Sequence, residues 1–171
     1  MTTAEQPDAR TELLDKVQRR LGRVPNLYAA MADAPAALEG YLAMHEQLGK
    51  GVLRARLREQ LALLTAQEND CTYCVSAHTF RGDRMGLTEQ ELLDTRQAVA
   101  ADPHTEALLR LAQDLIRTRG QIGDETRKAL ADAGVTDQEA GEVVAHVALN
   151  TLSNYYNHLA RPELDFPEVR A

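Results

Sequence analysis

Apolar residues recur along most of the chain at three- and four-residue intervals, which is the pattern of amphipathic helices. The first run contains Leu13, Leu14, Val17 and Leu21 and stops at Gly22. Further helices are predicted over about residues 27–31, 35–48, 54–67, 71–86, 89–99, 103–116, 124–133 and 139–159. The sequence has neither an alternating strand pattern nor a hairpin signal. It therefore predicts an all-α helical bundle of about seven to nine helices.

Several of the predicted helices begin at capping signals. Thr88 and Thr136 are each followed three residues later by a glutamate, which is the arrangement of a capping box. Asp33 is expected to cap the third helix and Asn69–Asp70 the fifth, because short polar side chains accept hydrogen bonds from the free N–H groups of a first turn. These signals set helix boundaries independently of the apolar spacing.

The chain is interpreted as a single domain over residues 1–171, with a motif-bearing core at about 24–100 and a C-terminal helix and tail at about 137–171. The last helix is apolar on more than one face, so it lies either inside the core or against a second subunit. Pro162 and Pro167 then predict an extended tail. Leu164 and Phe166 in this tail fit either a loose end or an arm that reaches a neighbour.

The composition limits the kind of protein this is. Hydrophobic residues make up 44% and charged residues 26% of 171 residues, which is an ordinary globular balance. No apolar run approaches the roughly 20 residues of a membrane span, and the N-terminus lacks the layout of a secretory signal, so a cytoplasmic protein is expected. A net charge of −7 and only 4% aromatic residues argue against a nucleic-acid partner.

The two cysteines, Cys71 and Cys74, lie three residues apart near the predicted start of a helix. A structural disulfide is disfavoured, because the cytosol keeps thiols reduced and so short a loop constrains little of the unfolded chain. Redox chemistry and metal binding remain. On a helix, His78 lies on the same stripe as both cysteines, and a helix N-terminus or an imidazole favours the reactive thiolate.

Glu59 is an acidic residue within an otherwise apolar stripe of the preceding helix, and it has two readings. If the Asn69–Asp70 break folds the two helices together, its carboxylate could orient His78 or carry its proton. Otherwise it lies exposed on the helix edge, paired with Arg56 or Arg58. Cys71, Cys74, His78 and Glu59 could also supply four zinc ligands, but three of these donors share one helix and cannot easily close a tetrahedron.

The other histidines are interpreted as structural or exposed. They are His45 in a helix as a partly buried residue, His104 in an exposed first turn, His146 in the core or an interface, and His158 in a polar seam with Asn150, Asn154 and Asn157. None of them is assigned a catalytic role.

The arrangement of Glu59, eleven intervening residues, Cys71-Thr72-Tyr73-Cys74, three residues and His78 resembles the AhpD-like alkylhydroperoxidases of the carboxymuconolactone decarboxylase superfamily. Val24–Tyr28, Leu149–His158 and Asp165–Pro167 resemble the peroxidase-related subgroup of that family. The resemblance extends over most of the chain and is strongest at about residues 24–100.

This resemblance implies that Cys74 attacks the peroxide, that Cys71 resolves the product into a disulfide, and that His78 and Glu59 form a proton relay. The helix-start argument taken alone favours Cys71 as the attacking thiol, as does the order in thioredoxin. His78 favours Cys74, because it lies one turn from Cys74 and two from Cys71. Tyr73 departs from the best-studied members, which carry a histidine there, and this puts a role of the position in proton transfer in doubt.

The expected function is therefore an antioxidant, peroxidase-like oxidoreductase with a redox-active CxxC pair and no cofactor or metal. The resemblance further implies a hydroperoxide substrate, an external dithiol or reductase partner protein, and a homo-oligomer, trimeric or hexameric. One alternative is a disulfide-exchange or redox-sensing module for which peroxide is not the substrate. Another is a zinc-stabilised binding scaffold.

Overall fold

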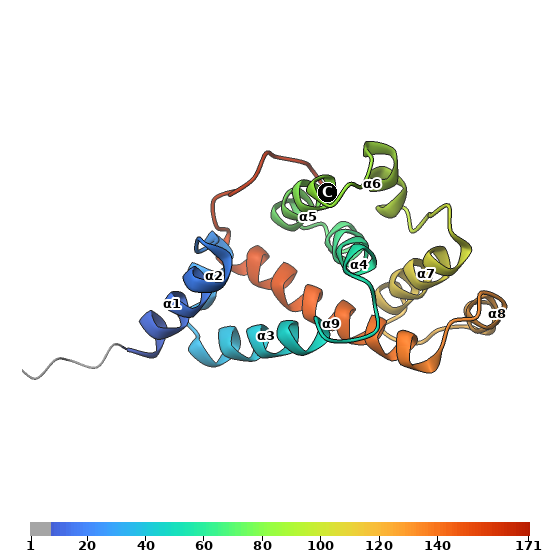
Figure 1. Cartoon of the computed structure of the whole chain (residues 1–171), viewed down its shortest axis with the longest axis horizontal. Coiled ribbons are helices and arrows are strands. Elements are labelled where there is room, and N and C mark those ends of the chain that lie inside the picture. Colours follow the sequence, from blue (N-terminus) through green and yellow to red (C-terminus); the bar gives the residue numbers. More distant parts are fainter. Residues whose placement is uncertain (1–7) are drawn as a thin grey trace, which may run out of the picture.

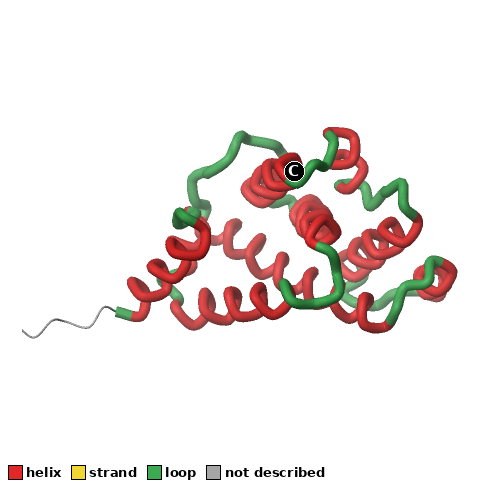
Figure 2. The backbone as a smooth tube through the Cα atoms, viewed as in Figure 1, coloured by secondary structure: helices red, strands yellow, loops and turns green. Residues whose placement is uncertain are grey.

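The computed structural model of the chain describes residues 8–171, and all regular structure in this part is helical (Figure 2). The described residues form α1 (Ala9–Leu21), α2 (Asn26–Met31), α3 (Pro35–Leu48), α4 (Ala55–Glu68), α5 (Thr72–Arg84), α6 (Glu89–Thr95), α7 (Pro103–Arg117), α8 (Asp124–Asp132) and α9 (Asp137–Ala160). The predicted all-α fold is confirmed, and helix boundaries agree with the sequence to within a few residues.

The long helix α9 runs through the molecule, with α3 beside it, α1 and α2 near its C-terminal end, and α7 and α8 near its N-terminal end (Figure 1). The buried apolar side chains form two clusters, one around α1–α3 and α5 and one around α4, α7 and α9. Helix α4 contributes to both, since Leu63 belongs to the first cluster and Leu61 and Leu64 to the second. A helix with two buried faces offers a fixed support for a site.

The capping boxes at Thr88 and Thr136 are confirmed, but the other two predicted caps are wrong. The Asp33 carboxylate is ion-paired with Arg10 instead, and α3 begins after Ala34 without a side-chain cap. Cys71 itself caps α5, while Asp70 adopts a left-handed backbone conformation with φ 54° in the tight α4–α5 turn. A capping role for Asp70 is excluded because this turn moves it out of the cap position.

The tail after α9 is extended, as predicted, and it crosses back over α5 (Figure 1). Val169 is bonded to Ser76 twice, through its N–H (2.9 Å) and its C=O (3.2 Å). The Asp165 carboxylate accepts hydrogen bonds from Tyr73 Oη and from the Asn26 N–H. The tail is therefore bound to its own chain, so the interpretation of a loose end is wrong.

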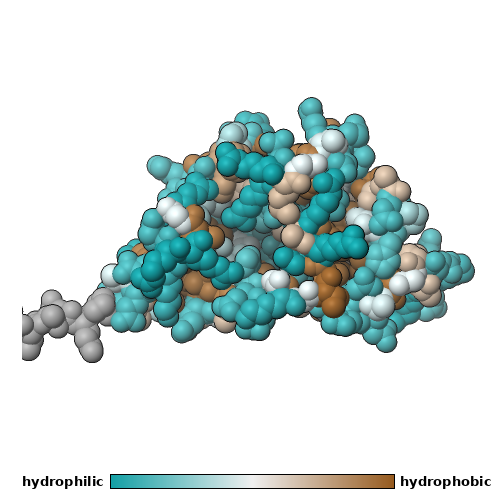
Figure 3. Space-filling model, viewed as in Figure 1, coloured by the Kyte–Doolittle hydropathy of each residue, from teal (hydrophilic) through white to brown (hydrophobic). Residues whose placement is uncertain are grey.

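Hydrophilic residues cover most of the face shown in Figure 3, with apolar patches between them. Within residues 8–171, no helix combines the length and hydropathy that crossing a membrane requires. Helix α9 nevertheless exposes one apolar stripe, in which Val144, Leu152, Tyr155 and Leu159 are 42–80% exposed. The last helix is therefore both a core helix and a source of uncovered apolar surface.

Candidate active site

The tight turn between α4 and α5 brings the two cysteines together. Cys71 lies at the N-cap of α5, where its Sγ accepts a hydrogen bond from the Cys74 N–H at 3.3 Å. The two Sγ atoms are 2.6 Å apart, both thiols are free, and the residues are only 2% and 3% exposed. Because their spacing is already short, a disulfide can form between them with little movement of the backbone.

The two thiols differ in acidity. The hydrogen bond with Cys74 lowers the pKa of Cys71 to about 7, and the Cys74 N–H acts in the same direction against the effect of burial. The pKa of Cys74 is raised, first by its hydrogen bond with Cys71 and then by burial. The first proton of the pair therefore leaves near pH 7, and the charge that results lies on Cys71, with the remaining proton on Cys74.

Two asparagines of α9 complete the surroundings of the thiols. Asn157 Nδ2 donates a hydrogen bond of 3.0 Å to Cys74 Sγ, and Asn154 Oδ1 accepts one of 2.9 Å from Asn69 at the end of α4. His158 Nε2 lies 2.8 Å from the Asn69 C=O, so the predicted polar seam joins α9 to the α4–α5 turn. This seam is predicted from the sequence, but its connection with the cysteines is visible only in the folded chain. The signal in the sequence is the series of asparagines, Asn150, Asn154 and Asn157, within an otherwise apolar helix.

Glu59 and His78 are in direct contact, with 2.6 Å between Glu59 Oε1 and His78 Nδ1. Their side chains are 15% and 13% exposed, so the interpretation of Glu59 as an exposed residue is wrong. Arg56 is instead ion-paired with Glu91, and Arg58 donates to the Leu53 C=O. Because Glu59 engages Nδ1, His78 keeps Nε2 for other partners.

The charge of Glu59 is stabilised by its neighbour. Burial acts to raise the pKa of Glu59, but the charge and hydrogen bond of His78 outweigh it, and the pKa stays below its ordinary value. A carboxylate on Nδ1 fixes the ring and stabilises the protonated imidazole. In this pair His78 can therefore carry a proton, and the Glu59 carboxylate holds its ring in place.

Cys74 and His78 line the same small cavity, whose volume is about 30 Å³. Such a volume holds about one water-sized group. Its other walls come from α2, α3, α5, α9 and the tail, and include Tyr28, Tyr41, Tyr73, Arg81 and Phe166. We call this space the reaction cavity.

Cys71 lines a different and wider cavity of about 440 Å³, bordered by the end of α9 and the start of the tail. Tyr73 belongs to both cavities and separates them. Burial and then the bond to the Asp165 carboxylate raise the pKa of Tyr73, so it stays protonated and holds the tail in place. The structure thus gives this residue a structural role between two openings.

A larger cavity of about 520 Å³ lies away from the cysteines, between α4, α6, α7 and α9, and includes Arg56, Glu91, His104 and Glu139. In it Arg56 is paired with Glu91 and His104 with Glu139, and neither cysteine lines it. Size alone therefore does not identify the site. Within residues 8–171, no group of three His, Cys, Asp or Glu side chains is placed to hold a metal ion.

The chain resembles known proteins both in sequence and in fold. The sequence pattern of the Carboxymuconolactone decarboxylase family matches residues 35–114, which include Glu59, both cysteines and His78. No curated protein sequence matches the chain significantly.

Solved structures share the fold over nearly the whole chain. A peroxidase-related protein from Silicibacter sp. TM1040 has a TM-score of 0.78 at 22% identity and covers 96% of this chain and 90% of its own. An alkylhydroperoxidase AhpD core protein from Ralstonia eutropha JMP134 has a TM-score of 0.77 at 26% identity, and the match covers 94% of this chain and 88% of the Ralstonia protein. The debrominase Bmp8 has a TM-score of 0.75 at 15% identity, and the match covers 96% of this chain and 90% of Bmp8. Over residues 35–114 the chain thus resembles the carboxymuconolactone decarboxylase family, and over nearly its whole length it has the fold of AhpD-like proteins.

Proposed function

We propose that the protein is a thiol-dependent peroxidase that reduces hydroperoxides through a Cys74–Cys71 disulfide cycle. One observation carries this proposal: Cys74 and His78 share the small reaction cavity, while Cys71 Sγ lies 2.6 Å from Cys74 Sγ. The cavity admits a hydroperoxide head and little else. A nucleophile, a proton carrier and a second thiol are therefore within reach of one small oxidant.

In the first step, the Cys71 thiolate accepts the proton of Cys74, which leaves the Cys74 thiolate facing the peroxide. Its sulfur attacks the outer oxygen of the hydroperoxide, an S–O bond forms and the O–O bond breaks. The alkoxide that leaves takes a proton from His78, whose positive charge Glu59 stabilises. Asn157 donates to the Cys74 sulfur and stabilises its thiolate form. The products are an alcohol and a sulfenic acid on Cys74.

In the second step, Cys71 attacks the sulfenic sulfur, the S–S bond forms and water leaves. The peroxide has then accepted two electrons from the thiol pair. An external dithiol or a reductase protein returns two electrons and two protons through thiol–disulfide exchange. Because the thiols themselves carry the electrons, the cycle needs neither a metal nor a flavin.

The fold by itself does not select this chemistry, since the debrominase Bmp8 has it too. What supports the peroxidase is the particular set of groups at the reaction cavity. The second candidate is a disulfide-exchange module, which the short Sγ–Sγ distance would also serve. A peroxide-specific burst of oxidation separates the two.

We also propose that the protein acts as a homo-oligomer. Val144, Leu152, Tyr155 and Leu159 recur along one face of α9 and remain exposed in the single chain. Covering such a stripe against a second copy removes apolar surface from water. Size-exclusion chromatography with light scattering gives the subunit number, and a monomer at all concentrations contradicts the proposal.

The test of the proposed cycle is consumption of cumene hydroperoxide with a dithiol donor. Wild-type protein should consume the hydroperoxide over many cycles, and Cys74→Ser should be inactive. Cys71→Ser should react once and accumulate a sulfenic acid on Cys74 that dimedone traps. If Cys74→Ser retains turnover while Cys71→Ser loses its single oxidation, the roles of the thiols are reversed. If the disulfide exchanges with dithiols but no peroxide oxidises it, the exchange module is correct.

A further inference from the structure

The reaction cavity is unusually aromatic for this chain. The sequence contains five tyrosines, two phenylalanines and no tryptophan, and four of these seven rings, Tyr28, Tyr41, Tyr73 and Phe166, line this one cavity. The rings of Tyr28 and Tyr41 are 5.8 Å apart. A hydroperoxide head needs no aromatic surroundings, whereas an apolar carbon body does favour them. The walls therefore indicate an organic peroxide.

A second cavity shares one wall with the reaction cavity. Tyr28 lines both, and the second cavity, of about 300 Å³, lies between α1 and α3. Its apolar floor contains Leu13, Val17 and Leu42. We call it the α1–α3 groove. Its volume is at the lower end of those of small-molecule sites, so it suits a body of about one substituted ring.

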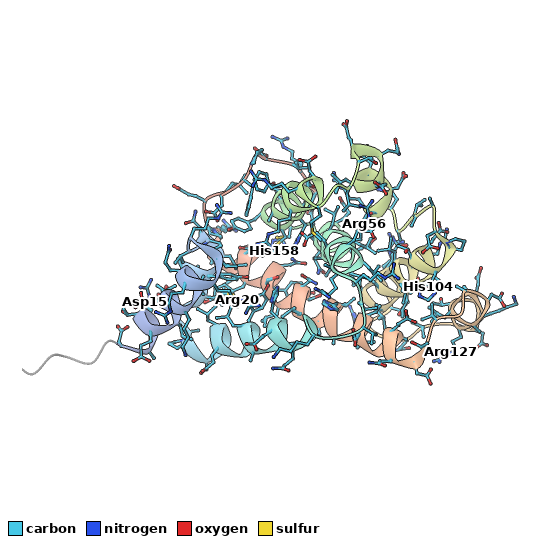
Figure 4. The ribbon with its side chains drawn as sticks, viewed as in Figure 1. Asp15, Arg20, Arg56, His104, Arg127 and His158 are labelled. Carbon is cyan, nitrogen blue, oxygen red and sulfur yellow. The ribbon has the colours of Figure 1, made fainter. Side chains whose placement is uncertain are left out.

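The groove and the cavity also carry positive charge. Arg81 lies in α5 one turn after His78, lines the reaction cavity and is half-buried. Arg20 lines the groove, on the side of α1 that faces α3 (Figure 4). In the described part of the chain, neither forms an ion pair. Burial lowers the pKa of His45, and the charges of Arg20 and Arg81 lower it further, so both act on one region.

The acidic groups near this region are mostly engaged. Glu59 is bonded to His78, and Glu46 at the groove is bonded to Lys50 at 2.8 Å. Glu39 also lines the groove, but Lys16 is present there as well. Two arginines that form no ion pair are therefore found at these two cavities in a protein whose net charge is −7. Arg81 acts on the Glu59 carboxylate and Arg20 on that of Glu46 through charge alone, without an ion pair. Their N–H groups are therefore suited to binding a carboxylate beside an apolar site.

We propose that the protein selects organic hydroperoxides that carry a carboxylate, which Arg81 binds with help from Arg20. The –OOH head enters the reaction cavity at Cys74, and the apolar body lies across Tyr28 toward the α1–α3 groove. The carboxylate lies outside the small cavity, near His45, where the charges of Arg81 and Arg20 both act. This inference rests on the proposed peroxidase function and adds the substrate class to it. Arg81 is a specificity-determining residue in this account, because it acts on the substrate away from the reacting atoms.

The test compares two matched substrates, the para-carboxylate of cumene hydroperoxide and the methyl ester of that carboxylate. Both have the same reacting group, so the ratio of their kcat/KM values reports the recognition of the charge and is insensitive to a general loss of activity. Wild-type protein should prefer the carboxylate about tenfold or more, as expected for one charged hydrogen-bonded pair. A ratio near one overturns the inference.

The variants locate the effect. Arg81→Met should bring the ratio close to one, Arg81→Lys should keep part of the preference, and Arg20→Met should reduce it to a smaller extent. Arg84→Met is the matched control, because Arg84 lies one turn further along α5, exposed over the Phe80 ring and outside both cavities. If Arg81→Met keeps the wild-type ratio, or Arg84→Met loses it as completely, the assignment is wrong.

Binding of unreactive analogues separates this inference from the peroxidase proposal. The tertiary alcohols that correspond to the two substrates lack the O–O bond, and calorimetry measures their affinities whether or not the protein consumes peroxide. Tighter binding of the carboxylate alcohol by wild-type protein, lost in Arg81→Met, supports the inference. Equal affinity for the two alcohols overturns it. Absence of peroxide turnover together with selective binding overturns the peroxidase proposal and leaves the carboxylate site in place.

Discussion

The protein contains two histidine–glutamate pairs that are alike in chemistry and different in surroundings. His78 and Glu59 are 2.6 Å apart and are 13% and 15% exposed, beside the thiols. His104 and Glu139 are 2.9 Å apart and are 35% and 23% exposed, where α7 meets α9. Figure 4 shows His104 at the opposite end of the molecule from Arg20. The same histidine–carboxylate contact is thus found once beside the thiols and once away from them.

The second nitrogen of each ring explains why their roles should differ. The Nδ1 atom of His104 lies 2.9 Å from the Ala133 C=O, so both of its nitrogens are engaged by the protein. Glu139 also belongs to the capping box of α9. This pair therefore ties α7, α8 and α9 together. In the described residues only Nδ1 of His78 has a hydrogen-bond partner, which leaves Nε2 available for the reaction. A histidine–carboxylate contact indicates catalysis only where one ring nitrogen is free and a nucleophile is near.

The largest expected difference between the pairs is in peroxide turnover. His78→Asn should lower kcat/KM for cumene hydroperoxide by roughly 100-fold, because the leaving oxygen loses its proton donor. His104→Asn should leave kcat/KM within a factor of two or so, since it changes no group at the cavity. Equal losses in the two variants would mean that His78 acts through the fold and not through the chemistry.

The carboxylates should differ in the same direction and by less. Glu59→Gln should lower kcat/KM by about 10-fold, because the amide no longer stabilises a positively charged His78. Circular dichroism and the unfolding midpoint check that the fold is kept. Glu139→Gln is the matched control and should retain turnover. An unchanged rate of Cys74 oxidation in Glu59→Gln would remove Glu59 from the relay.

The pH dependence of the thiols provides a third distinction. Since the pKa of Cys71 is lowered to about 7, alkylation of this thiol should rise with pH and reach its midpoint near pH 7. The measurement is the rate of iodoacetamide labelling from pH 5 to 9, with each cysteine followed by mass spectrometry. In Cys74→Ser the midpoint should move upward, because the stabilising thiol is replaced by a weaker partner. A midpoint near the ordinary value of about 8.5 in wild-type protein would contradict the shared charge.

The smallest expected effect is on stability and belongs to the other pair. Glu139→Ala removes both the capping contact and the ion pair and should cost about 1 kcal/mol, or a decrease of roughly 2–4 °C in Tm. The pKa of His104 is raised, first by its bond to the Ala133 C=O and then by Glu139. The stabilisation of the fold by protonated His104 is therefore complete below about pH 6.5, the unfolded-state pKa of histidine. It is lost as the pH rises through the higher pKa that His104 has in the folded protein. The Tm difference between wild type and His104→Asn should shrink over that interval.

The sequence predicted the helices well because their information is local: apolar spacing, capping boxes at Thr88 and Thr136, and prolines in the tail. It failed at Asp33 and Asp70, where a distant arginine and a tight turn decide the outcome. The spacing of Cys71, Cys74 and His78 along one helix was visible in the sequence. The contact of Glu59 with His78 remained open there, because it depends on how two helices pack.

The residues that the sequence did not assign come from distant parts of the chain. Asn157 reaches Cys74 from α9, and Asp165 binds Tyr73 from the tail. Arg81 is one turn beyond His78, but only the arrangement of α2, α3, α9 and the tail around α5 shows that it borders the reaction cavity. Such long-range contacts have no spacing signal, so the shape of the cavity and its charge emerge only in the folded chain.

The most direct test of the account is the mass of the protein after treatment with one equivalent of cumene hydroperoxide and then alkylation. In peroxide-treated wild-type protein neither cysteine should be alkylated, because both are held in the Cys74–Cys71 disulfide. When a dithiol is added before alkylation, both cysteines should be alkylated again. Cys71→Ser should instead gain a single oxygen on Cys74. Retention of both adducts in peroxide-treated wild-type protein, or a sulfenic acid on Cys71 in Cys74→Ser, would contradict the proposed cycle.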